Sequence, residues 1–410
     1  MFKLPTKFIA LAATGAFALA ACGSSTGGAA PTGSPSANAN AAAAVVDSKA
    51  ADLRTRLNYL LGEHLILAAK SVDAALGGRT AEFNAYGALL NTNGTELGEM
   101  IGAAYGAEAK TKFNGIWSAH NGFFVDYTTG VAKKDEAMKT KAVNNLTGTY
   151  IPQFSELISG ATGLPKDTVA ELTKTHVLTT KDIVDKLATK DYTGAYTAIR
   201  GAYAHMQMIG NPLATAIASG KPDLFPGDAK NKGVDLRVNL NMLLQEHLYL
   251  ATMATGAALG GRNEEFAAAG AALNTNGTDI GGAIGSLYGD EAKTKFNAIW
   301  SAHNGFFVDY TTGVAKKDEA MKSKAVDNLT GTYIPQFSEF ISGATGLPRD
   351  AVAELTKSHV LTTKDVVDAQ GAGDAAGAAT KDRQAAEHMQ MIGDPLAKAI
   401  VTKLPDKFAG

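Results

Sequence analysis

The residues in this chain best suited to metal chemistry are its histidines, which form two matched sets of four. Adding 183 to the number of each histidine in the first half gives a histidine in the second half, and no other histidine occurs. Neutral imidazole is a ligand that suits copper, zinc, iron and nickel. We therefore expect one transition-metal site in each half, with copper or iron first and zinc as a further option. The proposed ligands are His64, His120, His176, His205, His247, His303, His359 and His388.

Each histidine lies on the apolar stripe of a different predicted helix. Around His64, for example, Leu57, Leu60, Leu61 and Leu67 recur at spacings of three and four. This spacing places their side chains on one helix face, so four helices direct one imidazole each toward an interior. A single buried histidine is usually a hydrogen-bonded structural residue, and that reading of all eight is the main alternative. Haem held non-covalently through an axial histidine is another.

Two carboxylates and two thioethers are secondary ligand candidates. Glu63 and Glu246 each precede a histidine, although they point about 100° round the helix from it. Met208 and Met391 follow the last histidine of each half by three residues and share its expected face. Thioether with imidazole suits Cu(I), whereas the usual role of a core methionine is to fill gaps. Too few inward carboxylates are present for a di-iron carboxylate centre.

Asn93 and its counterpart Asn276 occur inside a helix pattern that otherwise diverges between the halves. Asn93 is in register with apolar positions such as Leu97, so its amide could orient a ligating histidine. The following glycine suggests instead a local break in the helix. The sequence favours the break slightly.

The two halves are copies of one unit that have diverged unevenly. From residue 109 to 182, 74 residues, only seven positions differ from the copy at 292–365, so identity inside this block is uninformative. Most positions between 186 and 204 differ, and Tyr196, for example, becomes Ala379. The segment 205–210 nevertheless returns unchanged as 388–393. A histidine held only by packing should change with its packing, so this retention favours a shared ligand role.

The N-terminal segment has the layout of a bacterial lipoprotein signal. A short basic stretch is followed by the apolar run Phe8–Leu19, which is too short for an ordinary membrane span. Leu19–Cys22 resembles a lipobox and contains the only cysteine. We expect residues 1–21 to be removed, Cys22 to carry the lipid, and 22–48 to form a flexible tether. The protein would then be extracytoplasmic and anchored to the cell membrane.

Composition excludes several classes of function. The chain is 45% hydrophobic and 19% charged, and its net charge of −2 becomes −4 without Lys3 and Lys7. No basic surface suited to nucleic acid is expected. A single cysteine excludes internal disulfides and thiolate metal sites. No phosphate-binding glycine loop, Gly-x-Ser-x-Gly or His-Glu-x-x-His motif is present, so nothing in the sequence requires an enzyme.

The patterns predict an all-α protein made of two tandem antiparallel helical bundles, each with about six helices. Repeat 1 should occupy 49–219 and repeat 2 should occupy 234–405, joined by a linker over 220–233 that is rich in glycine and proline. A kink or interruption is expected near Pro152, and a second kink is expected at Pro212. In the first repeat the helices are expected at about 51–76, 80–105, 109–133, 135–158, 166–189 and 192–217.

Three motifs carry a resemblance to a known family. These are Glu-His-Leu, then Phe-x-x-Ile-Trp-x-x-His-x-x-Phe-Phe-Val-Asp-Tyr, then Ala-x-x-His-Met-x-Met-x-Gly. Over 53–217 and 236–400 the chain resembles a little-studied family of secreted bacterial all-α tandem-repeat proteins, sometimes labelled automatically as copper amine oxidases. The resemblance implies the helical architecture and export, and the automatic label suggests copper as a metal. Amine oxidase activity is not supported, because the only Asn-Tyr pair, Asn58-Tyr59, is followed by leucine within a helix.

Overall fold

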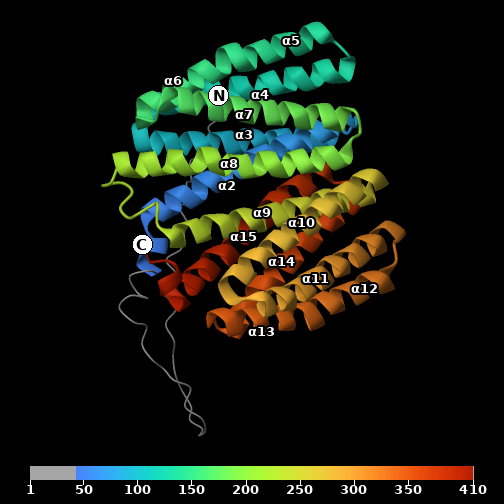
Figure 1. Ribbon diagram of the computed structural model, residues 1–410. Helices are drawn as coiled ribbons and strands as arrows, with labels where there is room; N and C mark the ends of the chain where they lie inside the picture. Colours follow the sequence, from blue (N-terminus) through green and yellow to red (C-terminus); the bar gives the residue numbers. More distant parts are fainter. Residues whose placement is uncertain (1–42, 410) are drawn as a thin grey trace, which may run out of the picture. The chain divides into compact units, whose positions relative to one another are not determined.

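The chain folds into helices that reproduce the repeat seen in the sequence (Figure 1). The computed structural model describes residues 43–409, and within this range no strand occurs. In the first repeat the helices are α2 (Lys49–Leu76), α3 (Thr80–Tyr105), α4 (Ala107–Lys133), α5 (Glu136–Asn145), α6 (Ile151–Thr162), α7 (Lys166–Ala188) and α8 (Tyr192–Gly220). In the second repeat they are α9 (Lys232–Leu259), α10 (Asn263–Tyr288), α11 (Asp290–Lys316), α12 (Glu319–Asn328), α13 (Ile334–Thr345), α14 (Arg349–Gly371) and α15 (Ala375–Lys403). The all-α prediction is confirmed.

Local sequence signals explain where these helices start and stop. Ser48 accepts a hydrogen bond from the amide of Ala51 at 3.2 Å, which satisfies one of the unpaired N–H groups at the start of α2. Asp135 caps α5 in the same way through the amide of Met138. Between α3 and α4, Gly106 adopts φ = +89°, a conformation that disfavours any side chain. The chain can therefore reverse direction there within one residue.

Proline has different effects at the two predicted kinks. Before Pro152 the helix widens into a π-helical turn over Leu146–Tyr150, with the same turn at Leu329–Tyr333 in the second repeat. A proline ring clashes with the carbonyl four residues earlier and offers no N–H, and a wider turn relieves both problems. The predicted interruption near Pro152 is thus confirmed. At Pro212, α8 continues as one helix from Tyr192 to Gly220.

The two repeats pack against each other within one compact unit. Helices α2 and α9 are the most deeply buried, and they contact each other as well as the other helices of their own repeats. The last helix of each repeat also crosses over, so that α8 packs on α10 and α15 packs on α3 (Figure 1). The contacts are reciprocal, as in a two-fold interface between identical subunits.

Arginines that reach from one repeat into the other show this reciprocity in detail. Arg383 of α15 donates to Glu63 of α2 at 3.1 Å and to Glu96 of α3 at 2.7 Å. Glu63 is fully buried, so its charge depends on this partner. The matching set, in which the repeats exchange roles, is Arg200, Glu246 and Asp279.

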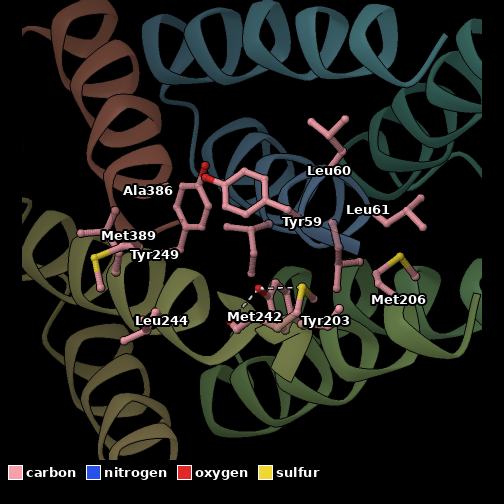
Figure 2. Close-up of a cluster of buried hydrophobic side chains, with 14 of the residues drawn as sticks. Tyr59, Leu60, Leu61, Tyr203, Met206, Met242, Leu244, Tyr249, Ala386 and Met389 are labelled. Atoms are coloured by element: carbon pink, nitrogen blue, oxygen red, sulfur yellow. Dashed lines mark hydrogen bonds between the residues drawn. The ribbon is translucent and has the colours of Figure 1, made fainter. Parts of the chain in front are cut away.

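The apolar part of this interface has become asymmetric (Figure 2). The hydroxyl of Tyr203 lies 2.9 Å from the carbonyl of Met242 and 2.7 Å from Oε1 of Gln245. The residue equivalent to Tyr203 in the second repeat is Ala386. Positions that differ between α8 and α15, such as this one, therefore lie at the interface between the repeats. There the two helices pack against different side chains.

A buried ion pair lies on one side of this interface only. Lys70 Nζ contacts Asp382 Oδ2 at 2.5 Å, and these side chains are 6% and 0% exposed. Tyr86 and Thr252 also hydrogen-bond to Asp382. At the equivalent position on the other side, the pair is replaced by apolar residues, Met253 and Ile199.

The expected signal peptide, Cys22 and most of the tether lie outside the described residues. Among residues 43–409, none of the helices combines the length and apolar character needed to cross a bilayer.

Candidate metal centre

Three of the four histidines in each repeat meet inside the bundle. His64 comes from α2, His120 from α4 and His176 from α7, and each is at most 4% exposed. One nitrogen from each imidazole lies within 4.8 Å of the others. The second repeat brings together the equivalent triad, whose nitrogens meet the same limit: His247, His303 and His359. We call these two groups the histidine clusters.

Hydrogen bonds orient the rings and leave nitrogens free. Nδ1 of His120 lies 3.2 Å from the carbonyl of Trp117, so this nitrogen carries the hydrogen and donates it. Nδ1 of His176 lies 3.4 Å from the hydroxyl of Thr180. In both rings Nε2 is buried without a hydrogen-bond partner, as is Nδ1 of His64. Fixing one imidazole nitrogen while leaving the other free is the arrangement found in metal-ligating histidines.

Unpartnered nitrogens argue against a purely structural role for the clusters. A buried polar atom without a partner destabilises a fold by about 1–3 kcal/mol, so native proteins leave few of them. Three rings of the first cluster and two of the second hold such atoms, with Nδ1 of His247 and Nε2 of His359 unpartnered in the second. Other buried polar atoms without a partner, such as Nε1 of Trp117, lie outside the clusters' imidazoles. A metal ion would satisfy the imidazole nitrogens of a cluster together.

Burial keeps the cluster histidines neutral. Desolvation lowers the pKa of His120 and of His303 to about 4, and the pKa of His176 to about 3. The pKa of His64 is also well below its usual value, first because of burial and then because of the neighbouring His120 and His176. Neutral imidazole is the form that ligates a metal, so the clusters are ready to bind one at neutral pH.

The depressed pKa values predict acid sensitivity of the metal-free protein. In the unfolded chain histidine titrates near pH 6.5, whereas His120 and His303 titrate near 4 when folded. As the pH falls through this window the unfolded state takes up protons first, so the free energy of unfolding decreases. Each of these two histidines should contribute a loss of at most about 3 kcal/mol between pH 6.5 and 4. Urea unfolding across this range should show the loss, and His120→Gln with His303→Gln should make it smaller; an unchanged pH dependence in that variant would contradict the assignment.

The fourth histidine of each repeat is not part of a cluster. Nε2 of His205 lies 2.9 Å from the carbonyl of Leu172, and Nε2 of His388 lies 3.1 Å from the carbonyl of Leu355. A carbonyl only accepts hydrogen bonds, so this nitrogen donates and ties the last helix to its neighbour. The predicted four-histidine site is therefore a three-histidine cluster with the fourth imidazole in a structural hydrogen bond.

The predicted methionine ligands point away from the site. Met208 and Met391 are both 60% exposed. The buried stripe of α8 is centred near Met206, and His205 lies at its edge. Three residues further on, the helix has turned the side chain of Met208 out of the interior. The expected thioether contribution is wrong in both repeats.

Glu63 and Glu246 bind the arginines of the opposite repeat rather than joining a cluster. Asn93 donates to Glu63 Oε2 and to the carbonyl of Leu60, both at 2.9 Å, and Asn276 makes the equivalent bonds in the second repeat. Both asparagines therefore orient a glutamate and not a histidine. The expected helix break beside Asn93 is wrong, because α3 is continuous. A Cβ atom on Gly94 would lie 2.8 Å from Trp117, so the glycine makes room for that ring.

Aromatic rings lie against the histidines of both clusters. Trp117 lies 4.6 Å from His64 between ring centroids, and Tyr150 stacks on His120 at 4.5 Å. The equivalent rings in the second repeat are Trp300 and Tyr333. Tyr150 lies in the segment 109–182, which is nearly identical to 292–365. Comparing the two repeats therefore could not single it out.

Each cluster also closes one end of a cavity. The volumes are about 260 Å³ in the first repeat and about 230 Å³ in the second. Beyond the histidines, the walls are mostly apolar. A metal held by three protein nitrogens would retain an open coordination position, as catalytic and exchangeable metal sites do.

The spacing of the nitrogens is compatible with a bound metal. Metal–nitrogen bonds of about 2 Å bring tetrahedral ligands to about 3.3 Å from one another. The nitrogens of each cluster lie within 4.8 Å of one another, so the three side chains come from the right directions to share one ion.

The fold and the clusters together define an all-α repeat protein with two buried three-histidine centres. Comparison with known proteins found no match to a family model, a curated protein or a solved structure. The assignment of function therefore depends on the chemistry of the clusters.

Proposed function

We propose that the protein is a membrane-tethered extracytoplasmic lipoprotein that binds one transition metal ion in each repeat, for storage, buffering or transfer. The observation that carries the proposal is the gathering, twice, of three buried neutral imidazoles, with one nitrogen of each within 4.8 Å of the others. The membrane attachment is proposed from Cys22 and the signal sequence before it.

The ligand set favours copper, with zinc as the next choice. Three imidazoles and no carboxylate form each cluster. Imidazole suits Cu(II) and Zn(II), and Cu(II) binds a given nitrogen site most strongly among the divalent first-row metals. Iron, the other first choice from the sequence, more often uses a carboxylate with two histidines. With Met208 exposed, the earlier argument for Cu(I) no longer applies.

Elemental analysis after loading tests the proposal. The chain purified in excess Cu²⁺ or Zn²⁺ and then desalted should retain two metal ions, one for each cluster. His64→Ala with His247→Ala should retain fewer than one, because each change removes one of three ligands. Retention of less than about one ion by the unaltered chain, unchanged in the double variant, would overturn the proposal. The histidines would then be structural residues of an interaction lipoprotein.

A further inference from the structure

The walls of the two cavities are mostly apolar, and they match each other at most positions. The first cavity is bounded by α2, α3, α4 and α7 and extends from its histidine cluster to the surface, where Val125 is 46% exposed. Apolar residues at equivalent positions line the second cavity. The matched pairs are Ala68 with Ala251, Ala75 with Ala258, Phe83 with Phe266, Leu90 with Leu273 and Phe124 with Phe307.

Divergence between the repeats has spared most of this lining, although Ser71, Val72 and Thr80 become Ala254, Thr255 and Asn263. On α3, Phe83 and Leu90 face the cavity and are retained in the second repeat. Asn84, Tyr86 and Leu89, which lie between them but do not line the cavity, are all alanine there. The helix has changed around Phe83 and Leu90, and these two positions have kept both size and apolar character, whereas Thr80 at the start of α3 becomes Asn263.

The volume and chemistry of the cavities define a class of ligand. A dry apolar cavity of about 150 Å³ already holds benzene. Cavities of about 260 and 230 Å³ therefore have room for an aromatic ring with a substituent. Apolar walls favour a neutral, mostly carbon body, because burying charge there would carry a large desolvation penalty.

At the histidine end of each cavity, the ligand must also carry one polar atom. Nε2 of His120 and Nε2 of His176 are buried without partners beside the cavity. A ligand that places a nitrogen or oxygen atom here can hydrogen-bond to a free imidazole or, when a metal is present, fill its open coordination position.

We propose that each cavity binds a small, neutral, mostly apolar molecule, about the size of a substituted aromatic ring, with one nitrogen or oxygen donor directed at the histidine cluster. Binding of the apolar body depends on the cavity alone. Coordination of the donor to a metal rests on the proposed function. The two parts are measured separately below.

The only two tryptophans of the chain report on the two sites. Trp117 lies 4.6 Å from His64 and Trp300 lies 4.5 Å from His247, between ring centroids. A ligand that enters either cavity as far as the histidines should change the tryptophan fluorescence.

The test titrates the metal-free chain with 4-phenylimidazole, which has an apolar ring and a nitrogen donor, and with imidazole, which has only the donor. The first should saturate two sites and bind at least ten-fold more tightly. Ala68→Phe with Ala251→Phe should weaken 4-phenylimidazole at least ten-fold, because the new rings occupy the cavities. The matched control is Ala119→Phe with Ala302→Phe, exposed positions on α4 and α11 that should leave binding unchanged.

A second pair of variants keeps the test decisive if the first pair does not fold. If the substitutions at Ala68 and Ala251 unfold the chain, Ala75→Leu with Ala258→Leu narrows the cavities farther from the histidines and should also weaken binding. Equal affinity for the two probes, or 4-phenylimidazole binding that no lining variant weakens, would overturn the proposal.

Coordination of the ligand's donor atom to a metal is tested with Co²⁺, because the visible absorption of Co²⁺ depends on its ligands. In the Co²⁺-loaded chain, 4-phenylimidazole should shift the visible spectrum at saturation. Binding seen by fluorescence with an unshifted spectrum would overturn the coordination part alone. Failure to retain Co²⁺, Cu²⁺ or Zn²⁺ would count against the proposed function, while the fluorescence titration of the metal-free chain would still decide whether the cavities bind the ligand.

Discussion

His176→Ala together with His359→Ala should lower the affinity of the protein for Cu²⁺ by about 100-fold or more. Each substitution removes one of three ligands, and loss of even a residue that supports a ligand typically reduces affinity by about 10- to 100-fold. Competition titration against a copper chelator of known affinity measures the change. Circular dichroism of the metal-free variant establishes that it remains folded.

The matched control is the histidine pair outside the clusters. His205→Ala with His388→Ala should leave the affinity within about three-fold, because Nε2 of His205 donates to the carbonyl of Leu172. This variant should instead be less stable by about 0.5–1.5 kcal/mol per site, since a partly buried hydrogen bond between helices is lost. An equal loss of Cu²⁺ affinity in both double variants would show that all four histidines of a repeat are ligands. No loss in either variant would show that the histidines have only structural roles.

Lys70→Met should destabilise the protein by about 3–5 kcal/mol, the largest stability effect we expect from a single substitution. The change leaves the carboxylate of Asp382 fully buried without its cation. Urea unfolding monitored by circular dichroism at pH 7 measures it.

The chain itself provides the compensating variant. The equivalent positions hold Met253 and Ile199, both buried in the apolar core. Lys70→Met combined with Asp382→Ile therefore installs a pair that this fold already accommodates, and should recover at least half of the lost stability. A double variant as unstable as Lys70→Met alone would show that the hydrogen bonds of Asp382 to Tyr86 and Thr252, and not the paired charge, hold this part of the interface.

Helical periodicity explains how much of the site could be predicted. The spacing of Leu57, Leu60 and Leu61 before His64 placed that histidine on the buried face of α2, and its side chain is 2% exposed. The same argument placed Met208 beside His205, where it failed. Periodicity gives the direction of a side chain only relative to the centre of the buried stripe, and the packing of α8 against a second repeat moved that centre toward Met206.

The interface between repeats was not predictable from pattern alone. Arg200 and Arg383 are retained in a segment that has otherwise changed, which was a usable signal, but nothing along the chain shows that each pairs with a glutamate of the other repeat. Glu63 was accordingly expected near a metal. Its position on α2, about 100° from His64, instead directs it toward the arginine.

By itself, the sequence determined the helices, their ends, the duplication and the inward direction of the eight histidines, because these depend on local propensity and on a period of 3.6 residues. Tertiary structure decided which three histidines meet, which one binds a carbonyl, and where a cavity remains. Those outcomes depend on how far each helix slides and rotates against its neighbours, a property of the packed core as a whole. Six of the eight matched histidines thus form two clusters of three, each beside a cavity whose lining is mostly shared between the repeats.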